Sequence, residues 1–134
     1  MRMDSKDKHQ VTKNHRLIQA MSHASQGIWM VISKERNMRY HLAASVIVII
    51  CGLLLRVAAW EWLWLFLAIF TVFSAEFMNT VAESFCDLVV GHQFDFNVKK
   101  IKDVSAGGVL IAALFAVIVG LIIFIPRLMA VFGG

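Results

Sequence analysis

The chain has 134 residues, of which 59% are hydrophobic and 16% are charged, and its formal net charge is +4. Such an apolar composition excludes an ordinary soluble domain of this size and predicts an integral membrane protein. The positive charge does not require a nucleic-acid partner, because basic segments beside a membrane are attracted to its anionic lipids.

The first segments of the chain are polar and then amphipathic. Residues 1–14 show no hydrophobic periodicity, which predicts a disordered polar tail. Residues 15–33 have the pattern of an amphipathic helix, with apolar side chains at steps of three and four: Leu17, Met21, Ala24, Ile28 and Ile32. Such a helix can lie flat on the membrane surface, although packing against a helical bundle would also explain the pattern.

Three apolar stretches follow, at residues 42–59, 62–81 and 104–125. Each is close to the ~20 residues that cross the hydrocarbon core of a bilayer as a helix. The sequence therefore predicts an all-α membrane protein with a three-span domain at residues 34–126. Residues 60–62 are expected to form a short turn between the first two spans, and residues 127–134 a short tail outside the membrane.

Lysine and arginine residues are distributed unevenly around these spans. Most of them precede the first span or lie between the second and third, whereas Arg56 and Arg127 stand on the opposite side. Basic loops tend to remain in the cytoplasm. The N-terminus and the loop at residues 91–103 are therefore predicted to be cytoplasmic, and the C-terminus to be outside.

The second span contains polar residues that a bilayer normally excludes: Glu76, Asn79, Glu83 and Asp87. A carboxylate at the centre of a membrane helix costs roughly 2.5–3.5 kcal/mol on insertion scales, so such a residue indicates a functional site. Positions separated by three, seven and eleven residues share one face of a helix. One face of this span is therefore predicted to be built for polar chemistry, in the cytoplasmic half of the membrane.

Other ionisable residues are predicted at the same depth. Glu35 precedes the first span, and Lys102 and Asp103 precede the third. Carboxylates beside a lysine can hold a divalent cation between acidic oxygens and nucleotide phosphates. Phosphoryl transfer needs mainly positioning, charge neutralisation and a proton acceptor, so these residues could support it without a P-loop, which the sequence lacks.

Several of these residues also have simpler interpretations. Asn79 would form an interhelical hydrogen bond equally well. Glu83 and Asp87 could be solvated at the membrane interface, and Asp103 could be the N-cap of the third span. A cation- or proton-conducting oligomer is a further alternative, but a continuous relay would need titratable partners in the outer half of the spans, where only Arg56 stands near the edge.

The pattern of Glu76, Asn79, Glu83 and Asp87, followed by Lys102-Asp103, resembles the signature of the small prokaryotic diacylglycerol kinases, especially their Gram-positive branch of undecaprenol kinases. The resemblance extends over about residues 16–126. It implies a homotrimer in the bacterial cell membrane, with a surface helix on each three-span subunit and active sites shared between neighbouring subunits. It also implies transfer of the γ-phosphate of Mg·ATP to a lipid alcohol at the cytoplasmic face, with undecaprenol as the expected acceptor and diacylglycerol as the alternative.

The resemblance also implies a role for individual residues. Glu76 would be the general base, Glu35 and Glu83 would bind Mg²⁺, and Asp87 would support the site. Residues expected to contact the nucleotide are Arg16, His23, Asn79, His92, Lys102 and Asp103. The chain departs from the family pattern at residues 91–93, where Gly-His-Gln replaces an acidic residue followed by Tyr-His, and at His23, where an aromatic residue is common.

Overall fold

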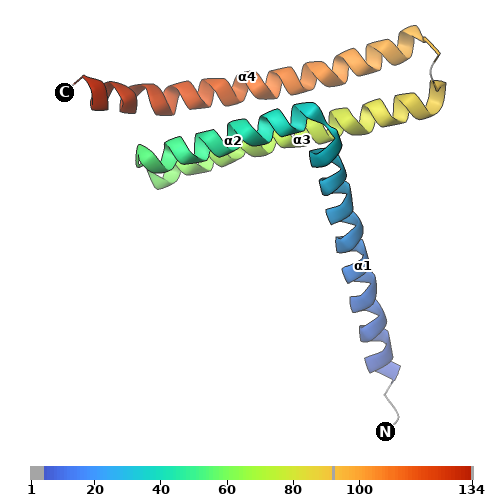
Figure 1. Ribbon diagram of the computed structural model, residues 1–134. Helices are drawn as coiled ribbons and strands as arrows, with labels where there is room; N and C mark the ends of the chain where they lie inside the picture. Colours follow the sequence, from blue (N-terminus) through green and yellow to red (C-terminus); the bar gives the residue numbers. More distant parts are fainter. Residues whose placement is uncertain (1–4, 92, 134) are drawn as a thin grey trace. The chain divides into compact units, whose positions relative to one another are not determined.

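The computed structural model describes residues 5–91 and 93–133, and side chains from residue 15 onward. In this part of the chain the structure consists of four α-helices: α1 (Ser5–Lys34), α2 (Arg36–Leu54), α3 (Ala59–Val90) and α4 (Phe96–Phe132). The expected all-α fold is therefore confirmed (Figure 1). The described residues fall into two units, one that ends at Glu35 and one that begins at Arg36, and each unit is described by itself.

Helices α2, α3 and α4 are each long and apolar enough to cross a membrane, which confirms the three predicted spans. With 32 and 37 residues, α3 and α4 would be about 48 and 55 Å long. Both lengths exceed the ~30 Å of a bilayer hydrocarbon core. The ends of these two helices therefore extend beyond the apolar layer, and the paired residues Asp87 and Lys102 lie near two of these ends.

The connection between α2 and α3 differs from the expected one. The helix α2 ends at Leu54 and α3 begins at Ala59. Residues 60–62, which were expected to connect the two spans, are therefore already helical residues of α3, and the connection consists of residues 55–58. A side chain fixes this start, because the backbone N–H of Ala58 donates to Oε2 of Glu61 at 2.6 Å. Arg56 lies in the connection and adopts a positive φ of 51°.

The boundaries of α4 also correct the sequence-based expectation. Asp95 is its N-cap, and its carboxylate accepts hydrogen bonds from the backbone N–H groups of Asn97 at 2.7 Å and Val98 at 3.1 Å. The alternative that Asp103 caps the helix is therefore wrong. Helix α4 continues through Pro126 to Phe132, so most of the expected C-terminal tail is helical, since a proline removes one backbone hydrogen bond without necessarily ending a helix.

Helix α1 begins ten residues earlier than its amphipathic pattern, at Ser5 instead of residue 15. Residues 5–14 contain no glycine or proline that would interrupt a helix. Extension of an existing helix is also much easier than its nucleation. The amphipathic segment can therefore propagate a helix into the polar residues that precede it.

The three long helices of the second unit pack around a small apolar core. Figure 1 shows α2 lying along α3, while α4 returns antiparallel to α3 after the loop that follows Val90. The buried core cluster consists of Val57, Leu65, Ala68, Val119 and Ile123. Most other large apolar side chains on these helices are exposed in the single chain, as expected for helices that can face lipid.

Gly52 permits the close approach of α2 and α3. A Cβ atom added there would lie 2.6 Å from Cη2 of Trp62, whose ring also stacks on Phe66 at a centroid distance of 5.4 Å. We expect Gly52→Ala to lower the free energy of unfolding by about 1–3 kcal/mol, because the indole must move out of its packed position. Chemical unfolding of the purified protein in detergent micelles would measure this loss.

Gly120 provides the matched control for this substitution. Its nearest neighbour to an added Cβ is Cδ2 of Phe124, at an ordinary contact distance of 4.0 Å. Gly120→Ala should therefore be neutral or slightly stabilising, because alanine favours a helix over glycine. An equal loss of stability in the two variants would contradict the proposed steric cause.

Candidate active site

The polar face of α3 runs from a buried residue to an exposed one. The exposed fractions are 2% for Glu76, 5% for Asn79 and 9% for Thr80, so these three side chains are buried. Glu83 is half-buried and Asp87, at the next turn toward the end of α3, is exposed. We call Glu76, Asn79, Glu83 and Asp87 the acidic strip. It connects the interior of the second unit with the polar end of α3.

Asn79 joins α3 to α4 and also contacts the next acidic residue of the strip. The hydroxyl of Ser105 donates to Oδ1 of Asn79 at 2.6 Å, and Nδ2 of Asn79 donates to Oε1 of Glu83 at 3.0 Å. The predicted interhelical hydrogen bond of Asn79 is therefore present. The same amide also orients the Glu83 carboxylate, so Asn79 both joins the two helices and contacts an acidic residue of the candidate site.

A second polar link between the two helices lies closer to the loop. Nζ of Lys102 donates to Oδ1 of Asp87 at 2.5 Å, which forms an ion pair between α4 and α3. Asp103 instead pairs with Lys99 within α4, one turn earlier. Lys102 of α4 thus contacts the polar residues of α3 through Asp87, whereas the Asp103 carboxylate pairs within its own helix.

An open cavity of about 520 Å³ lies beside these ion pairs, between the end of α3 and the start of α4. Its size falls within the range typical of small-molecule sites. The helix α3 ends there because Gly91 adopts a positive φ of 59° and turns the chain. Half of the described residues in its wall are charged: Asp87, Asp95, Lys99, Lys102 and Asp103.

The other predicted residues lie in the first unit or outside the described residues. Arg16 and His23 are exposed on α1, and Glu35 is half-buried immediately after it. His92 lies outside the described residues, so its predicted nucleotide contact stays a prediction. The structure brings Asn79 into contact with Glu83, and Lys102 into contact with Asp87, while Glu76 lies on the same helix as Asn79. The roles of Arg16, His23 and Glu35 also stay predictions.

Glu83 has the chemistry of a magnesium ligand. Its carboxylate offers hard oxygen donors at the half-buried edge of the strip, and Asn79 orients it through one oxygen. Within the described residues of one chain, no three His, Cys, Asp or Glu side chains are grouped closely enough to hold a metal ion. Nucleotide-bound Mg²⁺ needs only one or two carboxylates besides phosphate oxygens and water, so the residues present fit this kind of site.

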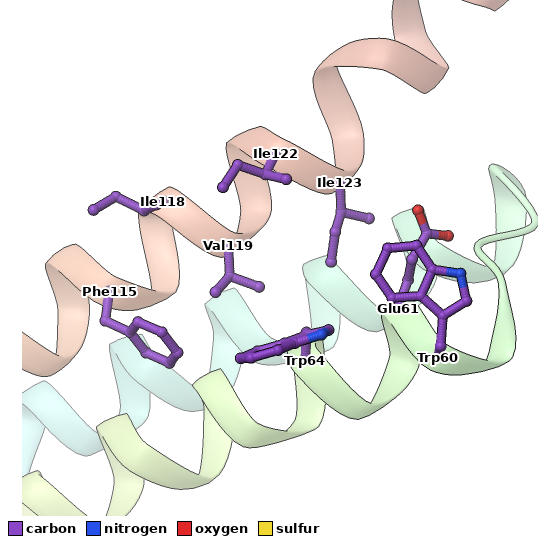
Figure 2. A pocket seen from close by; sticks show the side chains of 8 residues that line it. All are labelled: Trp60, Glu61, Trp64, Phe115, Ile118, Val119, Ile122 and Ile123. Carbon is purple, nitrogen blue, oxygen red and sulfur yellow. The ribbon is translucent and has the colours of Figure 1, made fainter.

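The opposite end of the α3–α4 pair is apolar and differs from the acidic strip. Figure 2 shows a pocket of about 270 Å³ there, with Phe115, Val119 and Ile123 of α4 directed toward Trp64 of α3. The carboxylate of Glu61 lies in its wall and pairs with Arg127, which also donates to the carbonyl oxygens of Leu55 at 3.2 Å and Arg56 at 3.1 Å. Among the described residues that line this pocket, Glu61 is the one charged side chain, and the others are aliphatic or aromatic.

The sequence matches the family model for prokaryotic diacylglycerol kinase over residues 22–124. The chain belongs to this family. An undecaprenol kinase of Bacillus subtilis (strain 168) is 40% identical over 126 residues, which covers 94% of the chain and all of the relative. A diacylglycerol kinase of Synechocystis sp. is 36% identical over 114 residues, which covers 85% of the chain and 65% of the relative.

This membership makes the chain a membrane lipid kinase, with ATP as the phosphate donor. The matched region contains α2, α3 and most of α4, and therefore the whole acidic strip and its partners. A lipid kinase must bring a charged nucleotide to a hydroxyl group at a membrane. The strip on α3 suits that task because it begins at a buried carboxylate and ends in a charged, open cavity.

The sequence-based predictions missed the roles of two residues in this region. Ser105 was not predicted to contact Asn79, although it follows Lys102 by three residues and therefore lies on a neighbouring part of the same helix face. Asp95 was not predicted as the helix cap, although an aspartate followed by a long helical pattern is a typical start signal. The predicted span began at residue 104 because its apolar stretch begins there, whereas the helix begins at Phe96.

Proposed function

We propose that this protein is an undecaprenol kinase, which transfers the γ-phosphate of ATP to the terminal hydroxyl of the polyprenol. The proposal rests on the 40% identity to a protein named undecaprenol kinase over the full length of that relative. The diacylglycerol kinase relative is matched over a smaller share of its length, so diacylglycerol is the second candidate acceptor for the same chemistry.

In this proposal Glu76 is the general base. The lipid hydroxyl oxygen forms a bond to the γ-phosphorus, the bond from that phosphorus to the β–γ bridging oxygen breaks, and ADP leaves. The hydroxyl proton passes to the Glu76 carboxylate. The burial of Glu76 supports this role, because an apolar lipid alcohol has to meet the base away from bulk water.

The acidic residues nearer the polar end would bind the metal and the nucleotide. Glu35 and Glu83 would hold Mg²⁺, which neutralises charge on the β- and γ-phosphates when bound. The Lys102 ammonium would contact phosphate, and Asp87 would keep that ammonium directed toward α3 through their ion pair. The remaining nucleotide contacts are assigned to Arg16, His23, Asn79, His92 and Asp103.

We also propose a homotrimer in the bacterial cell membrane, with sites shared between neighbouring subunits. The many exposed apolar side chains on α2, α3 and α4 in the single chain support burial against lipid and other subunits. Helix α1 would lie on the cytoplasmic surface, because its apolar residues Leu17, Met21 and Ile28 are exposed along one face. The N-terminus and active site would be cytoplasmic, and the C-terminus outside.

A conducting oligomer receives less support than a kinase. The acids Glu76, Glu83 and Asp87 are confined to one part of α3, and Glu61 at the other end is paired with Arg127. A proton relay would require titratable groups distributed across the bilayer. Proton flux through liposomes in the absence of ATP would favour the conductor.

Phosphorylation of defined lipids tests the proposed function. The purified protein in nanodiscs, supplied with Mg²⁺ and radiolabelled ATP, should phosphorylate undecaprenol with a kcat/KM about tenfold or more above that for diacylglycerol, a ratio that apolar contacts can provide. A reaction without Mg²⁺ is the control. A preference for diacylglycerol would change the acceptor, and failure to phosphorylate either lipid would contradict the kinase.

A further inference from the structure

Ser105 occupies an unusual position among the hydroxyl groups of the membrane helices. Its Oγ lies 2.6 Å from Oδ1 of Asn79 on α3 and 3.1 Å from the carbonyl oxygen of Lys102 on its own helix. The hydroxyls of Thr71 and Thr80, by comparison, donate to backbone carbonyls four residues earlier on α3. Ser105 therefore reaches across to a neighbouring helix, whereas these two threonines bond within theirs.

The hydrogen-bonding capacity of the groups sets the direction of this contact. A serine hydroxyl has one hydrogen to donate, and the nearer acceptor is the amide oxygen of Asn79. With its oxygen bonded to Ser105, the Asn79 amide directs Nδ2 at Glu83, where a donor is required because a carboxylate only accepts. The reverse orientation would place the amide oxygen against the carboxylate. The order Ser105–Asn79–Glu83 is thus chemically consistent at both contacts.

The link also lies one turn from the second connection between these helices. Lys102, whose carbonyl oxygen is the other acceptor near Ser105, forms the ion pair with Asp87. Ser105 and Lys102, one turn apart on α4, therefore bond to Asn79 and Asp87 of α3. These two positions of α3 are eight residues apart. Connected polar contacts of this kind limit the freedom of each member, since a buried amide without a partner is costly.

We infer that Ser105 is a positioning residue of the kinase site, which holds the Glu83 carboxylate through Asn79 in the orientation that binds the magnesium–nucleotide complex. This inference rests on the proposed function, because it takes the metal role of Glu83 from there. Ser105 itself needs no contact with ATP or lipid. Its removal leaves the charge of the site unchanged and frees the amide that directs Glu83.

Nucleotide affinity is the direct measurement of this role. For Ser105→Ala, we expect the Kd for the magnesium complex of a non-hydrolysable ATP analogue, measured by calorimetry, to rise about three- to tenfold, the effect of one lost hydrogen bond. Ser105→Thr, which keeps the hydroxyl, should bind like the wild type. Thr71→Ala is the matched control, because its hydroxyl bonds only within α3 in the structure and should leave the Kd unchanged.

A double-mutant cycle tests whether the effect passes through Asn79. In an Asn79→Ala background, Ser105→Ala should change the Kd by less than about twofold, because the link is already broken. An undiminished effect there would overturn the inference, as would an unchanged Kd in Ser105→Ala accompanied only by a lower unfolding temperature. If the alanine variant does not fold, Ser105→Cys, which retains a weak donor, should show a smaller rise in Kd, and wild-type affinity would contradict the role.

The binding assay separates this inference from the proposed function. Wild-type protein that binds the magnesium–nucleotide complex but phosphorylates neither lipid would contradict the acceptor chemistry, while the comparison of Ser105 variants would still be decisive. Conversely, an active wild type with equal affinity in Ser105→Ala would leave the kinase assignment intact. That second result would remove only the positioning role.

Discussion

Replacement of Glu76 by glutamine should lower kcat for lipid phosphorylation by about 10²- to 10⁴-fold, the range expected when a general base is removed. The side chain is 2% exposed, and glutamine has nearly the same shape, so the packing around it should persist. A neutral amide also costs less to bury in a membrane helix than a carboxylate. The affinity for the magnesium–nucleotide complex and the oligomeric state should therefore change little.

Glu61→Gln is the matched control for this experiment. Glu61 is a second buried carboxylate of α3, 8% exposed, at the opposite end of the helix and paired with Arg127. Its replacement should leave kcat near the wild-type value and lower the unfolding temperature, because Arg127 loses a charged partner. Near-normal turnover of Glu76→Gln in the same assay would remove Glu76 as the base.

The spans could be predicted from sequence because their signal is the length of an apolar run. Their ends could not be located in this way, since α3 and α4 continue beyond the apolar layer. Single hydrogen bonds determine these ends, such as those from the backbone to Glu61 and Asp95. Hydropathy describes how well a segment suits the membrane, whereas a helix cap is a local feature that hydropathy does not detect.

The acidic strip could also be predicted, because helical periodicity alone places Glu76, Asn79 and Glu83 on one face. The partners of its members could not. The contacts of Ser105 with Asn79 and of Lys102 with Asp87 depend on how far α4 is shifted along α3, which the loop between them and the packing of both helices determine. Sequence spacing fixes positions within one helix and leaves the axial register of two helices open.

Replacement of Glu83 by glutamine should raise the Mg²⁺ concentration required for half-maximal activity by at least about 10- to 100-fold. Loss of a group that merely supports a metal ligand typically has an effect of that size, so loss of a ligand should not have a smaller one. The glutamine carbonyl can still accept the hydrogen bond that Asn79 donates to Glu83 at 3.0 Å. The variant therefore removes the charge and leaves the link to Ser105 in place. Glu35→Gln should raise the requirement in the same direction.

Asp95→Asn separates a metal ligand from a general change of charge. Asp95 lies in the wall of the cavity beside Asp87 and Lys102, and asparagine replaces aspartate well as an N-cap. This variant also loses one negative charge at the same end of the helices, and its Mg²⁺ requirement should stay close to that of the wild type. If Asp95→Asn raised the requirement as much as Glu83→Gln, the cause would be the local potential, since Asp95 has no ligand role in the proposal. An unchanged requirement in both Glu35→Gln and Glu83→Gln would contradict both ligand assignments while leaving the role of Glu76 to its own test.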